Sequence, residues 1–143
     1  MKQLNKVSAI EDFRIDLRLF ERAIDRINKS TCSLGINVPQ CHTIMEIGLA
    51  APLSVNTLAE KMSVDKSTIS RQIEKLVKNE LVIRTASPED RRKVNISLSL
   101  KGKEIYQTMN TSLNEQFKNA FQKINHKDLN IFFKVFSQLA KIL

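Results

Sequence analysis

The residues best suited to chemistry lie on one face of a short predicted helix, residues 66–78. The first half of this face carries short hydroxyl side chains and a long cation. Short side chains let a helix approach the major groove of DNA closely, and an arginine can bond the O6 and N7 atoms of one guanine together. The face therefore indicates a DNA-reading surface, and its candidate contact residues are Lys66, Ser67, Thr68, Ser70, Arg71 and Lys75.

A second basic segment follows directly along the chain. Residues 81–84 read as a strand, and apolar residues alternate with polar ones over residues 94–100, so the polar stretch between them is the turn of a β-hairpin. An arginine on such a hairpin can enter the minor groove, where the negative potential is strong. The candidate DNA contacts of the hairpin are Arg84, Asp90, Arg91, Arg92 and Lys93.

Two short helices must position the first of these surfaces. Ser54 is a plausible N-cap of one helix, and Asp65 is a plausible N-cap of the helix at 66–78, with Ser63 and Val64 forming the turn between them. Two helices joined by so short a turn form a helix-turn-helix, and the hairpin behind them is its wing. The inner face of the second helix should be Ile69, Ile73, Leu76 and Val77.

Apolar residues at helical spacing also mark both ends of the chain. Ser8 and Glu11 form a capping box, which predicts that the first helix begins at Ser8. Pro39 fits the first turn of a second helix, and a C-terminal helical region opens at residues 99–102 and breaks at 125–128. The broad apolar stripes at the two ends predict burial against each other and against a second copy. The candidate dimerisation residues are Ile10, Phe13, Leu17, Phe20, Phe132, Phe133, Phe136 and Leu139.

From residue 58 to 102 the chain resembles the MarR family of bacterial winged-helix regulators. The matching segments are Leu58-Ala59-Glu60, the run Asp65 to Arg71, Leu76 to Arg84, and Asp90-Arg91-Arg92 with Val94, Leu98, Ser99 and Gly102. The resemblance implies that Asp90 pairs with Arg92 and directs it toward DNA. One departure is Asn79-Glu80, where the family usually has a glycine before the strand. Asn79 is expected to close the helix instead, because asparagine tolerates the left-handed conformation.

Composition narrows the classes of function. The formal net charge of +8 calls for an anionic partner, with nucleic acid first and a membrane surface second. The three glycines, Gly35, Gly48 and Gly102, are too far apart for a phosphate-binding glycine loop. No apolar run approaches the length of about 20 residues that a membrane helix needs, and the N-terminus lacks the apolar region of a secretory signal. We therefore expect neither an enzyme nor a membrane protein, and no cofactor.

Cys32, Cys41 and His42 form the remaining cluster that could do chemistry. Two sulfurs and an imidazole could bind zinc, but the spacing lacks a CxxC pair and a certain fourth ligand. A nearby cation such as Lys29 could activate a thiol toward oxidants. Cys41 can equally pack as a small apolar residue. Two cysteines do not form the disulfide framework of secreted proteins, so we expect a cytoplasmic protein with reduced thiols.

The sequence as a whole predicts a mainly α fold, a winged helix-turn-helix with a small β-hairpin wing and terminal dimerisation helices. One domain, residues 1–143, should comprise the DNA-binding module at 37–103 and a helical dimerisation region at 1–36 plus 104–143. The expected function is sequence-specific binding of double-stranded DNA by a homodimer, as a repressor of a palindromic operator that answers to a small-molecule effector. The alternatives are a metal- or thiol-sensing regulator, a non-specific architectural DNA binder, and an interaction dimer that has lost DNA binding.

Overall fold

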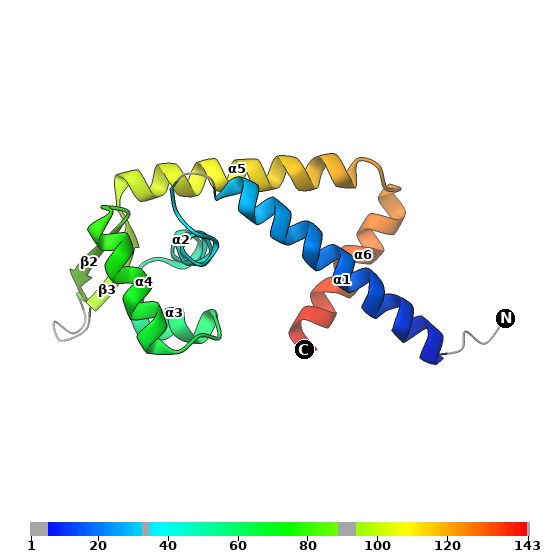
Figure 1. Ribbon diagram of the computed structural model, residues 1–143, viewed down its shortest axis with the longest axis horizontal. Helices are drawn as coiled ribbons and strands as arrows, with labels where there is room; N and C mark the ends of the chain where they lie inside the picture. The colour runs from blue at the N-terminus through cyan, green and yellow to red at the C-terminus, as the bar shows by residue number, and fades with distance from the viewer. Residues whose placement is uncertain (1–5, 33–34, 89–93, 143) are drawn as a thin grey trace. The chain divides into compact units, whose positions relative to one another are not determined.

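The computed structural model of the chain describes residues 6–32, 35–88 and 94–142. Within them it shows six helices and three short strands (Figure 1): α1 (Lys6–Thr31), α2 (Val38–Ala50), β1 (Leu53–Ser54), α3 (Val55–Lys61), α4 (Lys66–Lys78), β2 (Val82–Ala86), β3 (Val94–Leu98), α5 (Leu100–Phe121) and α6 (His126–Ile142). The chain forms two compact units, Met1–Asn110 and Thr111–Leu143. The mainly α class with a small hairpin is confirmed.

The first unit is built around a buried apolar core. Its centre consists of side chains from α2, α3, α4 and β3 that recur at every third or fourth residue of the helices and every second residue of the strand, which puts them on one face of each element. The members with no exposed surface are Ile44, Ile47, Leu58, Ile69, Ile73, Leu76 and Ile96. Because α4 contributes three of them, its inner face is fixed to the module.

The sheet of the first unit is antiparallel, with strand order β1-β3-β2. Val82 pairs with Leu98 and Ala86 with Val94, which gives the expected hairpin. Leu53 pairs with Ile96, so the two residues of β1 add a third strand that the sequence pattern did not predict. The expected apolar alternation is correct at Ile96 and Leu98, which are buried, but Val94 is exposed.

The helix starts follow local side-chain chemistry. At α2, the side chain of Asn37 accepts from the backbone N–H of Gln40, and the Gln40 side chain accepts from the backbone N–H of Asn37, both at 3.0 Å. Pro39 lies in the first turn, as predicted. At α3, the Ser54 hydroxyl accepts from the N–H of Thr57 at 3.1 Å, which confirms Ser54 as the N-cap.

Three local expectations were wrong. Helix α1 already includes Lys6, so Ser8 lies inside the helix and does not cap it. Of the two expectations for residue 100, the helix start at residues 99–102 is correct, whereas the strand to residue 100 is wrong: Leu100 begins α5, where it is 81% exposed. Asn79 keeps a φ of −85°, and it is Glu80 that takes the left-handed conformation, with a φ of 61°. The turn after α4 therefore closes one residue later than predicted.

The connection between the wing and α5 is held by close backbone packing. The Ser99 hydroxyl donates to the carbonyl of Glu80 at 2.6 Å and accepts from the N–H of Gly102 at 2.9 Å. A Cβ on Gly102 would collide with the backbone carbonyl oxygen of Leu81. Only glycine allows this approach, so the end of α4, the base of the wing and the start of α5 form one tightly packed corner.

Candidate nucleic-acid interface

Asp65 fixes the start of α4. Its side chain accepts from the backbone N–H of Thr68 at 2.9 Å and from the hydroxyl of Ser67 at 2.5 Å. These hydrogen bonds, from Ser67 first and then from Thr68, hold the pKa of the Asp65 carboxyl well below its ordinary value, because they stabilise the charged form. Asp65 is confirmed as the N-cap, and it also orients the first hydroxyl of the polar face.

The two faces of α4 have opposite character. Ile69, Ile73 and Leu76 are fully buried, whereas the cations and most hydroxyls of the opposite face reach the surface. Lys66, Ser67, Arg71 and Lys75 are exposed, and Thr68 and Ser70 are half-buried. The structure thus brings all six predicted helix residues to the outer side of one helix that is anchored from behind, which is the arrangement that a recognition helix requires.

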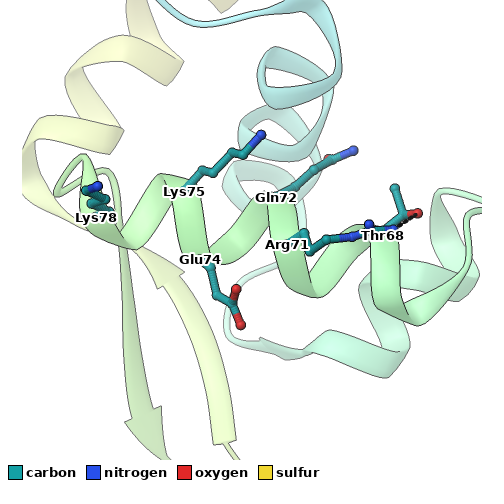
Figure 2. Close-up of a pocket in the computed structure, with 6 residues that line it drawn as sticks. All are labelled: Thr68, Arg71, Gln72, Glu74, Lys75 and Lys78. Atoms are coloured by element: carbon teal, nitrogen blue, oxygen red, sulfur yellow. Dashed lines mark hydrogen bonds between the residues drawn. The ribbon is translucent and has the colours of Figure 1, made fainter.

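The side chain of Arg71 runs back along the first turn of α4. Its Nε donates to the carbonyl of Ser67 at 3.3 Å, and its Nη2 donates to the hydroxyl of Thr68 at 3.5 Å. Figure 2 shows the guanidinium directed toward Thr68. These contacts are long and exposed, so a DNA partner can replace them at little cost. The arginine is held near the end of the helix that would enter a groove.

A shallow hollow of about 420 Å³ follows the outer side of α4. Figure 2 shows Gln72 and Lys75 leaving the helix on one side and Glu74 leaving it on the other. The lining residues are Thr68, Arg71, Gln72, Glu74, Lys75 and Lys78. Gln72 was not among the predicted contacts. The sequence offered a weak signal for it, since it lies four residues after Thr68 and three before Lys75, on the side of the helix that they share.

Gln72 is held by a residue that is distant in sequence. The Thr43 hydroxyl, on α2, donates to Gln72 Oε1 at 2.6 Å, and Thr43 has no exposed surface. The same hydroxyl oxygen lies 2.9 Å from the carbonyl of Pro39 and 3.8 Å from the sulfur of Met62. The amide of Gln72 is therefore tied to the core of the module.

The wing is described only in part. Arg84 lies on β2, opposite Ile96 of β3, and its side chain is exposed. The other predicted wing contacts, Asp90, Arg91, Arg92 and Lys93, lie outside the described residues, so the expected pairing of Asp90 with Arg92 stays a prediction.

The cysteine cluster differs from the expectation. Cys32 and Cys41 form a disulfide, with Cα atoms 6.1 Å apart, and both are buried. The end of α1 and the first turns of α2 meet there, which brings the two residues together despite the break between them. The expectation of reduced thiols is therefore wrong for this structure. His42 Nε2 lies 3.3 Å from Nδ2 of Asn28, and the described residues contain no cluster of metal-ligating side chains.

The candidate dimerisation residues are largely uncovered in the single chain. On α1 the exposed fraction falls from 59% at Ile10 to 37% at Leu17, and on α6 Phe132, Phe133 and Phe136 are 43–47% exposed. Within the second unit, the ring of Phe121 meets that of Phe133 edge to face, with ring centroids 5.1 Å apart. Leu139 is half-buried.

A helix-turn-helix with a polar, cation-bearing second helix and a following hairpin defines the winged-helix class of DNA-binding proteins. A family model, the MarR family, matches residues 36–94. A relative from Bacillus subtilis, the uncharacterized HTH-type transcriptional regulator YsmB, is 33% identical over 105 residues, which are 73% of this chain and 72% of the relative. The chain therefore belongs to the MarR family of transcriptional regulators and is not an enzyme.

Solved structures support the same fold. A MarR family protein from Bacillus stearothermophilus superposes with a TM-score of 0.83 at 19% identity, over 96% of each chain. FabT from Streptococcus pneumoniae, solved in complex with DNA, superposes with a TM-score of 0.77 at 19% identity, over 90% of this chain and 94% of its own. Among the described residues, no helix is both long and apolar enough to cross a membrane.

Proposed function

We propose that this chain is a sequence-specific repressor that binds a palindromic DNA operator as a homodimer in the cytoplasm and answers to a small-molecule effector. The observation that carries the proposal is α4: its inner face is fully buried, while Ser67, Arg71 and Lys75 on its outer face are exposed. The solved FabT structure of the same fold contains DNA, which supports DNA as the partner.

In this proposal each protomer places α4 in the major groove and its wing over the backbone and minor groove. Lys66 and Lys75 would contact phosphates, while Ser67, Thr68, Ser70 and Arg71 would face the base edges. On the wing, Arg84, Arg91, Arg92 and Lys93 would add positive charge, and Asp90 would direct Arg92. The formal charge of +8 favours such an electrostatic footprint.

The dimer is inferred from the exposed apolar side chains. A soluble monomer rarely tolerates a continuous apolar patch larger than a few hundred Å², and α1 carries two half-exposed phenylalanines and α6 carries three. We assign the helices outside residues 37–103 to dimerisation. Two protomers would hold two α4 helices at a fixed separation, and an effector acts by changing that separation, because half-sites one helical turn apart tolerate little error.

The experiment has two parts. Sedimentation at low micromolar concentration should give twice the protomer mass of 16.4 kDa. Competition between a selected operator and random DNA should show a preference of about 10³-fold or more. Equal binding to every sequence would instead identify an architectural DNA binder, and no binding at all would identify an interaction dimer.

The buried cysteine pair favours a second candidate, a regulator that senses thiol oxidation. A low-molecular-weight disulfide could oxidise Cys32 and Cys41 by thiol exchange, so that one protein disulfide forms, two small thiols are released and the reagent is reduced. Cys41 lies two residues before Thr43, which contacts α4 through Gln72. If the Cys41→Ser protein folds and binds DNA but no longer responds to oxidant, this candidate is supported. A metal role requires the reduced form, since in the structure both sulfurs are bonded to each other.

A further inference from the structure

We propose that Gln72 is a specificity-determining residue that donates hydrogen bonds to one base pair, and that the buried Thr43 fixes which end of its amide is available. The inference rests on the proposed DNA-binding function and assigns a preference within it. It begins from a contact that joins a fully buried hydroxyl to the outer side of α4, the Thr43–Gln72 hydrogen bond of 2.6 Å.

The position of Gln72 suits a base contact. It is half-buried at the edge of the outer face of α4 and lines the same hollow as Thr68, Arg71 and Lys75. Figure 2 shows its side chain leaving the helix on the side of Lys75, with the amide nitrogen at its tip. A glutamine in a recognition helix is long enough to reach a base edge in the major groove.

Thr43 restricts the amide. A hydroxyl has one proton, and that of Thr43 has two oxygen acceptors within reach, Gln72 Oε1 at 2.6 Å and the carbonyl of Pro39 at 2.9 Å. The shorter contact goes to Gln72, so Oε1 points toward the core and the two N–H donors of Nε2 point outward. Thr43 cannot move away easily, because its side chain has no exposed surface and contacts both Gln72 of α4 and Met62, the C-cap of α3.

This orientation changes what the glutamine recognises. A free glutamine reads adenine with both ends of its amide, as acceptor to N6 and donor to N7. With Oε1 turned inward, only the donor end remains, and its complement is a base edge rich in acceptors. Guanine presents two acceptors in the major groove, N7 and O6, whereas cytosine presents an amino donor. The structure therefore points to guanine at the position that Gln72 contacts, and Thr43 is its positioning residue.

The test uses the full-length protein and a selection from randomised DNA duplexes, followed by titrations on duplexes that differ from the selected site at one base pair. Wild type should prefer guanine at one position by about 5- to 140-fold, the span of one good base contact. Gln72→Ala should lose that preference and keep the others. Gln72→Glu, which can only accept, should favour cytosine there. Gln107→Ala, an exposed glutamine on α5, serves as the control and should match wild type.

Thr43→Val removes the hydroxyl and keeps the shape, so the freed amide should shift the preference at the same position from guanine to adenine. If this variant loses its fold, the two Gln72 variants still decide the proposal. A Gln72→Ala protein with unchanged preferences, or with an equal loss on every sequence, would overturn it. A wild type that selects no sequence at all would instead contradict the proposed function.

Discussion

Gly48 of α2 faces the aromatic ring of Tyr106 on α5, and a Cβ placed on Gly48 would overlap three carbon atoms of that ring. Tyr106 packs against the buried core of the first unit. A glycine inside a helix costs about 1 kcal/mol relative to alanine. At this position α2 therefore gives up intrinsic helix stability in exchange for a close approach to the tyrosine ring.

Gly48→Ala should destabilise the protein by about 1–3 kcal/mol, the usual cost of forcing an extra carbon into a packed core. The free energy of unfolding can be measured by urea denaturation. In a Tyr106→Leu background the same substitution should be neutral or stabilising, because the obstructing ring is gone and alanine is the better helix former. An equal penalty in both backgrounds would contradict the argument.

Arg71→Ala should reduce the affinity for a selected operator by about 1–3 kcal/mol and leave binding to random DNA nearly unchanged, because the lost contact is to a base. Fluorescence anisotropy with labelled duplexes at fixed salt measures both affinities. Lys75→Ala provides the comparison. It should weaken binding to operator and random DNA alike, and it should reduce the slope of log affinity against log salt concentration by about one. If Arg71→Ala instead lost the same affinity for operator and random DNA, Arg71 would contact a phosphate and not a base.

The Asp65 carboxyl should titrate below its ordinary value of 3.8, because Ser67 and Thr68 bond its charged form in the folded state. Because the pKa is lower in the folded than in the unfolded state, the ionised Asp65 side chain stabilises the fold fully above about pH 4. This contribution to the free energy of unfolding is lost as the pH falls through the folded-state pKa. Carbon-13 NMR should find Asp65 still ionised at about pH 3. Ser67→Ala should raise the pKa of Asp65 toward the ordinary value. If the pKa of Asp65 is the same in this variant as in wild type, the Ser67–Asp65 hydrogen bond is not its cause.

Reduction of the Cys32–Cys41 disulfide should lower the stability of the protein by about 2–3 kcal/mol, the entropic effect of opening a short loop. The sequence separation of the two cysteines is nine residues. Denaturation with and without dithiothreitol measures the difference. The double variant Cys32→Ser, Cys41→Ser should behave alike under both conditions; if it too loses stability on adding the reductant, the effect does not arise from this bond.

Local spacing was enough to predict the helix that carries the interface. The apolar repeat from Ile69 to Leu76 and the cap at Asp65 lie within one helix, and α4 has the predicted bounds. Local signals also predicted α3 and the existence of the hairpin, but not the strand ends: β2 runs over Val82–Ala86 and not 81–84, and β3 ends at Leu98 and not at residue 100. The pattern could not predict β1, because Leu53 reads as a strand only through its partner Ile96, 43 residues further along the chain.

The missed features of the site are also contacts between distant residues. Thr43 and Gln72 are 29 residues apart, and although the spacing of Gln72 gave a weak signal, nothing in the sequence pattern pairs it with Thr43. The left-handed residue of the turn after α4 was mispredicted for the same reason: the carbonyl of Glu80 accepts from Ser99 on the far side of the wing, and this contact accompanies the positive φ at Glu80. Sequence spacing predicts the face of a helix, whereas the partner of each side chain depends on the assembled fold.

The corner made by Ser99, Gly102 and the end of α4 also affects how freely the length of the wing can change. At the base of the wing, Ser99 is joined to Glu80 by its hydroxyl, and to Leu81 by a hydrogen bond from its backbone N–H to the Leu81 carbonyl at 3.0 Å. Once the two ends of a loop are held together, each doubling of its length costs only about 0.6 kcal/mol of closure entropy. The hairpin between them can therefore gain or lose residues, and so acquire a new reach or charge, while the module that holds α4 keeps its stability.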